Sequence, residues 1–461
     1  MFPSTIQLYI TDRVYFSSDT HTFCANLSLQ YTPFYGLVCF VWAVLLYRFW
    51  ERKENELAYK WGTLDLSNTA NGVPQDYSYK KGGLYAHRRL EFRGETRTSP
   101  ITGKPELYYP SHKRKLQYLL SAMVTALMLS VAFSVMILSL NLQGYIRPSN
   151  SQDYHPFYFA RFAILSEEGA WFDATSSWKC FIPVILHAGS ILTLNTIYRG
   201  VARKLTGWEN HETQTAYENS LILKRFLFEA FDCYIVLFYL AFYERDVERL
   251  RFELVAVFNI DSFRRIGTET ILPYIIHRLT DPKVSDNSAH DLFLDEYEQF
   301  DDYMEVLIQF GYVVLFASAY PLASLLMAGA MWLEIRSDIH KLTNLCQKPL
   351  SGERIHNLGV WKRILQFMVW FSCLTNCLLF GFTSDQMMHY MPDLYIRDDD
   401  GVTHLIQDKG WVVILIIFGL ERTLLFGGLV LHSMIPAMPE SLLIQLHRRK
   451  YLLAQNSKKT D

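Results

Sequence analysis

The stretch that decides the fold is DYMEVLIQFGYVVLFASAYPLASLLMAGAMWLEIRSDIHKLT, residues 302–343. It contains two long apolar runs that meet at SAYPLAS, where Pro321 suits a tight turn. No charged residue lies between Glu305 and Glu334, and acids stand at both ends. The stretch therefore predicts two membrane-spanning helices, 303–319 and 320–341, whose charged ends lie on one side of the bilayer.

The same pattern of apolar runs and polar loops extends along the whole chain. It has 461 residues, of which 50% are hydrophobic and 20% are charged. A helix needs about 20 mostly apolar residues to cross a bilayer. Segments of this kind predict an all-α fold, a polytopic membrane helix bundle of about nine spans, at 33–50, 117–141, 179–198, 221–243, 252–277, 303–319, 320–341, 364–385 and 410–435.

Basic residues cluster in alternate loops, which places those loops in the cytosol. We therefore expect an extracellular segment at 1–32, a transmembrane domain at 33–435 and a cytosolic tail at 436–461. The domain would have cytosolic loops at 51–116, 199–220 and, with an acidic composition, 278–302; its larger extracellular loops would lie at 142–178 and 386–409.

Other classes of protein find little support in the sequence. The net charge of −2 gives no reason to expect a nucleic-acid partner. Nothing assembles a nucleophile with a base, so an enzyme is not expected. The seven cysteines form no CxxC pair, and a disulfide between Cys24 and Cys180 near the outer face stays an alternative.

Acids gather at the cytosolic halves of three predicted spans. The segment 252–277 carries Glu269, 303–319 begins at Asp302 and Glu305, and 320–341 ends at Glu334 and Asp338. Five carboxylates at one depth in a low dielectric require cations, and Ca²⁺ prefers oxygen ligands. The alternative is that each acid is solvated separately at the membrane boundary.

At these residues the chain resembles the anoctamin family of calcium-activated chloride channels and phospholipid scramblases. The stretch 302–343 is the most specific match. Further similarity covers most of the chain from about residue 35 to 450, with the motifs FWERKENELAYKWGTLDL, ITGKPELYYP, YRGVARKLTGWENHETQTAYENSLILKRFLFEAFDCYIVLFYLAFY and SMIPAMPESLL.

The resemblance implies that the nine spans are the family's second to tenth, without its N-terminal cytosolic domain and first span. It implies a homodimer in which each subunit has its own groove for lipids or ions. Calcium would draw one groove helix toward the others, with Gly267 and Pro273 as places where it bends. The Ca²⁺ ligands carried over are Glu269, Asp302, Glu305, Glu334 and Asp338.

Two positions depart from the family pattern. Arg265 stands where the family commonly has an asparagine near the calcium site, which leaves open whether one or two ions bind. Ala437 stands where the family often has an aspartate, which makes a further, peripheral calcium site doubtful.

A third substitution suggests a partner for the arginines. Asp232 stands where the family usually has an asparagine, and it lies about 18 Å from the cytosolic end of its span, as does Arg265. We hypothesise that Asp232, with Glu229, pairs with Arg264 or Arg265 across the groove. The alternatives are a ladder within the helix, from Asp261 through Arg265 to Glu269, or an arginine that faces an aqueous groove.

The predicted function is calcium-regulated transport of phospholipids, of ions or of both. A calcium-activated channel for chloride or other anions is the alternative, since arginines in a pore attract anions. A membrane tether or regulatory subunit with an altered calcium site is the second alternative. The expected location is the plasma membrane or the endoplasmic reticulum.

Overall fold

A computed structural model gives the fold in two compact units, residues 1–73 with 239–461 and residues 74–238. We call these the split unit and the central unit. The structure describes residues 18–63, 89–98, 103, 105–146, 156–167, 169–172, 179, 181–265, 267, 271–272, 275, 297, 299–344, 346–347, 358–383, 387, 390–397, 403–406 and 409–460.

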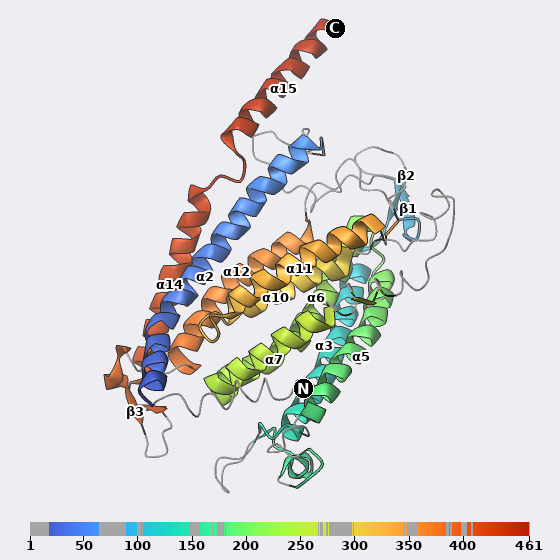
Figure 1. Cartoon of the computed structure of the whole chain (residues 1–461). Helices are drawn as coiled ribbons and strands as arrows, with labels where there is room; N and C mark the ends of the chain where they lie inside the picture. Colours follow the sequence, from blue (N-terminus) through green and yellow to red (C-terminus); the bar gives the residue numbers. More distant parts are fainter. Residues whose placement is uncertain are drawn as a thin grey trace. The chain divides into compact units, whose positions relative to one another are not determined.

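Helices lie at all nine positions predicted as spans, which confirms the all-α prediction (Figure 1). They are α2 Ser18–Lys60, α3 Ser111–Leu142, α5 Phe181–Trp208, α6 Gln214–Phe238, α7 Val247–Arg265, α10 Gln299–Leu315, α11 Ala323–Asn344, α12 Val360–Leu378 and α14 Gly410–Met434. Shorter elements are β1 Glu95–Thr98, β2 Pro105–Tyr108, α4 Ala160–Ala163, η2 Ile164–Ser166, η3 Tyr239–Glu244, η6 Leu379–Thr383, η7 Pro392–Leu394, β3 Tyr395–Arg397 and β4 Thr403–Leu405. A final helix, α15, covers Glu440–Thr460.

Five described helices are long and apolar enough to cross a membrane: Pro33–Lys60, Ser111–Leu142, Gln214–Glu244, Val360–Thr383 and Gly410–Met434. The other four predicted spans coincide with α5, α7, α10 and α11, which do not meet this test over their described residues. The chain is therefore a multi-pass membrane protein, and the number of nine spans stays a prediction.

The central unit is a three-helix bundle in which α3, α5 and α6 contact one another (Figure 1). Its core contains Ala132, Tyr198, Ala202 and Phe228, and the rings of Tyr198 and Phe228 stack with centroids 4.1 Å apart. The Tyr198 hydroxyl is also within hydrogen-bonding distance, 3.1 Å, of Thr125 Oγ1. Through ring stacking and this buried polar contact, Tyr198 of α5 joins α3 and α6 at the same level of the bundle.

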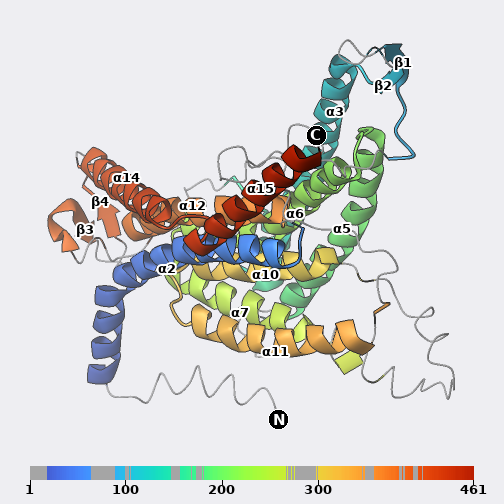
Figure 2. The ribbon, with the colours of Figure 1, turned by 90° about the horizontal axis from the view of Figure 1, so that it is seen from above.

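The split unit packs α12 against α2, α10 and α14. Figure 2 shows α10, α7 and α11 following one another away from α2. The helix α14 approaches its neighbours closely at Gly428. A Cβ atom there would lie 2.9 Å from both Phe40 and Trp370. The missing side chain thus allows α2 and α12 to pack against α14.

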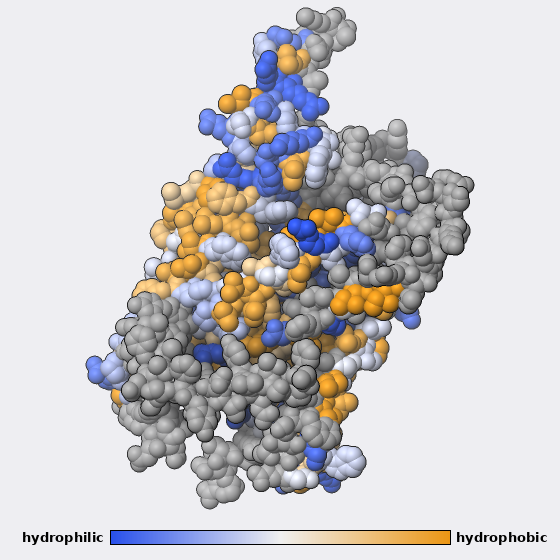
Figure 3. Space-filling view, viewed as in Figure 1, coloured by the Kyte–Doolittle hydropathy of each residue, from blue (hydrophilic) through white to orange (hydrophobic). Residues whose placement is uncertain are grey.

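The surface of α14 is apolar while that of α15 is polar (Figure 3). Residues Trp411, Ile414, Leu415, Phe418, Phe426 and Leu429 on α14 are exposed. A contiguous exposed apolar face is what a bilayer covers. On α15, Leu442 and Leu446 pack with Met438 and Tyr59, whereas Arg448 and Arg449 are exposed.

Candidate calcium site

The hairpin of α10 and α11 brings acids and bases from its two ends together. Asp302 lies in the first turn of α10, and Lys341 lies in the last turn of α11. The turn at Pro321 reverses the chain between the two helices, so the start of one meets the end of the other. An acid at a helix N-terminus and a base at a C-terminus are each stabilised by the helix dipole.

Both carboxylate oxygens of Asp302 have donors. The Lys341 ammonium lies 2.8 Å from Oδ1, and the Tyr297 hydroxyl donates to Oδ2 at 2.7 Å. Partial burial and the hydrogen bond to Asp302 raise the pKa of the Tyr297 phenol, which keeps it a donor. Lys341 is also 5.9 Å from the centre of the Tyr297 ring. Neither partner was predicted: the Lys341 contact depends on how α10 and α11 pack, and the Tyr297 contact depends on the conformation of the chain just before α10.

The second predicted ligand of α10 also faces a base. Arg264 Nη2 of α7 lies 3.7 Å from Glu305 Oε1, and the Glu305 side chain is only 11% exposed. Glu334 and Asp338 lie half-buried on α11. Among the described residues no three acids, histidines or cysteines form a group able to hold a metal ion. Glu269, the fifth predicted ligand, lies outside the described residues.

The donor chemistry of the predicted ligands nevertheless suits calcium. Four of the acids come from two helices that contact each other, and carboxylate oxygens are the ligands that Ca²⁺ prefers. Asp302 and Glu305 would supply ligands from α10, and Glu334 and Asp338 would supply them from α11. Bound calcium would provide a divalent charge at this level, and the basic partners already described would compete with it for two of the acids.

Comparison with known proteins identifies the family. The family model described as "Anoctamin: Calcium-activated chloride channel" matches residues 2–449. The chain belongs to the anoctamin family. The resemblance proposed from the sequence is thereby confirmed, and the family's description supports calcium regulation in general terms.

Named relatives resemble this anoctamin at low identity. Human Anoctamin-10 is 28% identical over 428 residues, which cover 89% of this chain and 57% of the relative. Human Anoctamin-7 is 26% identical, and the match covers 92% of this chain and 50% of the relative. Human Anoctamin-3 is 25% identical, and the match covers 78% of this chain and 38% of the relative. The chain thus spans about half the length of the curated relatives that it matches.

The predicted groove residues are described only in part. Asp232 of α6 is 6% exposed, and its Oδ2 atom has no hydrogen-bond partner within the described structure. Arg264 pairs with Glu305, whereas the side chain of Arg265 lies outside the described residues. Asp232 and the arginines belong to different units, so their pairing, with or without Glu229, stays a prediction.

The bend predicted at Gly267 and Pro273 of the span 252–277 is also untested. Gly267 is described, and a Cβ atom added there would meet nothing within 4 Å. Pro273 lies outside the described residues.

Side chains of α2 donate hydrogen bonds to the segment around Ala437, where the family's peripheral calcium site was doubtful. Asn55 Nδ2 of α2 donates to the carbonyl oxygen of Ala437 at 3.0 Å. Arg48 of the same helix donates to the carbonyl oxygen of Ile435. Two backbone oxygens just after α14 are therefore satisfied by side chains of α2, and the absence of a peripheral calcium site stays a prediction.

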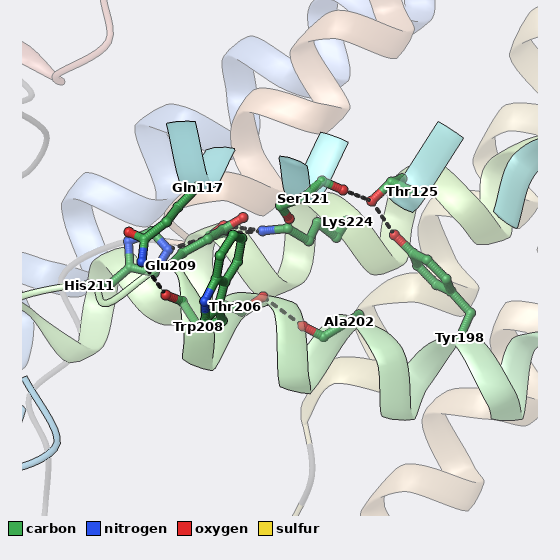
Figure 4. A network of polar contacts seen from close by, with 11 residues as sticks. Gln117, Ser121, Thr125, Tyr198, Ala202, Thr206, Trp208, Glu209, His211 and Lys224 are labelled. Carbon is green, nitrogen blue, oxygen red and sulfur yellow. Dashed lines mark hydrogen bonds and ion pairs between the residues drawn. The ribbon is translucent and has the colours of Figure 1, made fainter. Parts of the chain in front are cut away.

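A buried carboxylate in the central unit was missed by the sequence reasoning (Figure 4). Glu209 follows the end of α5 and is 1% exposed. Its Oε2 atom lies 2.9 Å from His211 Nε2, and it accepts hydrogen bonds at 2.8 Å from both Ser220 and Lys224 of α6. The only sequence signal was a Glu-x-His placed between two helical patterns, which is weak by itself.

Electrostatics around Glu209 favour its ionised form. Burial by itself raises the pKa of this carboxyl, but the hydrogen bonds from His211 and Lys224 outweigh burial and lower the pKa to about 2. A buried acid with three donors on one oxygen ties the turn after α5 to α6.

Proposed function

We propose that this anoctamin is a calcium-regulated transport protein that moves phospholipids, ions or both through a groove in each subunit of a homodimer. The observation that carries the proposal is the set of acids at the meeting ends of α10 and α11, beside the basic residue Arg264 of α7. Paired charges at one level on three neighbouring helices are costly in a membrane and mark functional sites.

The polar character of α7 supports a path for headgroups. This helix carries Arg249, Arg251 and Arg264, which are exposed or half-buried, and it does not meet the criterion for an apolar span over its described residues. A charged helix that borders lipid offers polar contacts to a headgroup while the acyl chains stay in the bilayer. Membrane lipids are thus the proposed substrate, and the plasma membrane or endoplasmic reticulum is the proposed location.

The test is lipid scrambling in liposomes with a calcium titration. We expect calcium to accelerate the exchange of a labelled phospholipid between leaflets. Glu305→Gln should abolish this acceleration, because it removes an anionic oxygen ligand. Asp301→Asn is the matched control, since it removes a negative charge from the same helix, four residues before Glu305 and outside the predicted ligand set.

Equal calcium-dependent scrambling by the wild type and by Glu305→Gln would contradict the gating role. Anion conduction is the second candidate, and the family's description as a calcium-activated chloride channel favours it. Chloride current recorded beside lipid flux in the same preparation separates the two. Calcium-activated current without lipid exchange would establish the channel.

A further inference from the structure

The inner face of α6 carries an acid with one oxygen that the described structure leaves without a donor. Four buried residues of this helix share that face, because they follow one another at intervals of three and four positions: Arg225, Phe228, Asp232 and Val236. Phe228 belongs to the core of the central unit and stacks on Tyr198 of α5. Asp232 therefore lies one helical turn beyond this ring pair, on the face turned toward the core.

A second acceptor lies at the same level of the bundle. Asp232 is 6% exposed, and its Oδ2 atom is buried without a hydrogen-bond partner among the described residues; the buried Oδ1 atom of Asn195 on α5 likewise has none there. The helices α5 and α6 contact each other and run in opposite directions, joined by the turn at Glu209. Asn195 precedes Tyr198 by about one turn, so it reaches the level of Asp232.

The protonation state of Asp232 decides whether these two oxygens can be satisfied. An ionised carboxylate only accepts hydrogen bonds, whereas a protonated carboxyl has an O–H group that donates. A buried charge without a partner is costly, and a buried acceptor without a donor adds to that cost. The neutral acid avoids both costs, because its hydroxyl can donate to the amide oxygen of Asn195.

The charged residues near this level do not favour an ionised Asp232. On α6, Glu229 lies one turn before Asp232, and a second negative charge there disfavours ionisation. Arg225 lies two turns, or about 10 Å, before Asp232 along the same helix. On α5, Arg199 lies one turn from Asn195. Both arginines have interactions of their own, and neither forms an ion pair with Asp232 within the described structure.

The remaining titratable groups that face this level supply no cation either. The Tyr198 hydroxyl is within hydrogen-bonding distance, 3.1 Å, of Thr125 Oγ1. His187 lies two turns, or about 12 Å, beyond Asn195 on α5. The third helix of the bundle, α3, has no charged residue from position 116 to its end at Leu142. The surroundings of Asp232 in the central unit therefore resemble those that hold a carboxyl in its neutral form.

We propose that Asp232 is a proton-binding site of the central unit, where its neutral carboxyl donates a hydrogen bond to Asn195. A proton adds to the carboxylate oxygen, and no other bond changes. Release of this proton leaves two buried acceptors side by side, with Glu229 one turn away. The folded bundle therefore keeps the proton at a pH at which an aspartate in water has lost it. The site is separate from the predicted calcium ligands and does not depend on the proposed transport function.

Infrared spectroscopy of the purified protein in detergent detects this proton directly, because a protonated carboxyl absorbs apart from an ionised one. At neutral pH we expect a carboxylic-acid C=O band in the wild type that is absent from Asp232→Asn, whose side chain has almost the same size. Glu218→Gln is the matched control and should keep the band, since Glu218 is exposed on α6 and contacts Gln214. Asn195→Leu should move the band to a higher wavenumber, because the hydroxyl loses its acceptor.

Thermal unfolding at several pH values gives an independent measurement. The unfolded chain releases the proton of Asp232 above about pH 4, whereas the folded chain keeps it. The unfolding equilibrium of the wild type therefore shifts about tenfold per pH unit toward the unfolded state, relative to Asp232→Asn. The unfolding temperature of the wild type should fall relative to that of Asp232→Asn as the pH rises, and Glu218→Gln should follow the wild type.

A wild type without the band would overturn the proposal, as would a band that persists in Asp232→Asn. A difference in unfolding temperature that stays constant with pH would also overturn it. Asp232→Leu, which is close in size and apolar, should lack the band too and replaces Asp232→Asn if that variant fails to fold. An ionised Asp232 would require a cation, as in the predicted pair with an arginine of the groove.

Discussion

Glu209 shows how a single residue stabilises the end of the central unit at which α5 meets α6. Its carboxylate accepts from Ser220 and Lys224 and lies against His211, so it connects the end of α5 with the first turns of α6. The next residue, Asn210, has a positive φ of 54°. The Asn210 side chain pairs with the backbone of Arg93, accepting from its N–H at 3.0 Å and donating to its carbonyl at 2.7 Å. Consecutive residues thus tie the turn to α6 and to the segment before β1.

Substitution of Glu209 tests this arrangement. Glu209→Gln leaves Lys224 buried without its anionic partner, and the loss of one member of a buried pair costs about 3–5 kcal/mol. We expect the variant to unfold at a clearly lower temperature in detergent. Glu218→Gln is the matched control, because Glu218 is exposed on α6 and contacts Gln214. Equal unfolding temperatures for the two variants would contradict the role of Glu209.

Because the pKa of Glu209 is lowered, the stabilisation that it contributes depends on pH. The pKa of its carboxyl is about 2 in the folded protein and 4.5 in an ordinary setting. The folded state thus favours the ionised form, so the contribution is fully present above about pH 4.5 and is lost as the pH falls toward 2. The difference in unfolding temperature between wild type and Glu209→Gln should accordingly narrow below pH 4.5.

At the scale of elements, α14 depends on a small residue for its packing. Gly428 is buried, and an added Cβ atom would lie 2.9 Å from Phe40 of α2 and from Trp370 of α12. Gly428→Ala should destabilise the protein by about 1–3 kcal/mol, because a well-packed contact cannot accept more volume without shifting. Thermal unfolding in detergent measures the loss.

The adjacent glycine provides the control for this prediction. A Cβ atom at Gly427 would meet nothing within 4 Å, and the residue is exposed on the same helix. Gly427→Ala should be neutral or slightly stabilising, since alanine favours a helix more than glycine does. A loss of stability in Gly427→Ala as large as that in Gly428→Ala would show that backbone effects, and not packing, decide the result.

The elements were predictable from sequence to different degrees. Hydropathy found α3, α12 and α14 because an apolar run of that length has few other structures. Hydropathy predicted a span at 33–50, whereas the helix α2 covers Ser18–Lys60. The prediction is shorter because polar turns that continue past the apolar run carry no hydropathy signal. The helices α5 and α6 likewise extend through most of the predicted loop 199–220.

The candidate site was predictable in its acids but not in its bases. Spacing and family resemblance pointed to Asp302 and Glu305 as candidate ligands, because residues three apart share one helix face; their binding of calcium stays a prediction. The ammonium of Lys341 and the guanidinium of Arg264 reach these acids from other helices. Contacts of this kind depend on interhelical packing and on side-chain rotamers, which a single sequence does not encode in a readable pattern.

At the scale of the whole molecule, the predicted calcium ligands that the structure describes lie in the split unit. The helices α10 and α11 contact each other within it, while α3, α5 and α6 form the central unit with its own core. A bound ligand raises the free energy of opening only for those openings that force it to dissociate. Calcium should therefore protect the two units from local opening to different extents.

Amide hydrogen exchange in the presence and absence of calcium measures this difference. At a calcium concentration 100 times the Kd, opening of the binding helices should cost about 2.7 kcal/mol more, which slows exchange about 100-fold. We expect that slowing at the meeting ends of α10 and α11 and not at the core of α3 and α5. Glu305→Gln should remove it, while Glu209→Gln should leave it intact. Equal protection in both units of the wild type would mean that they open together, so that calcium bound at α10 and α11 would also stabilise the central helices.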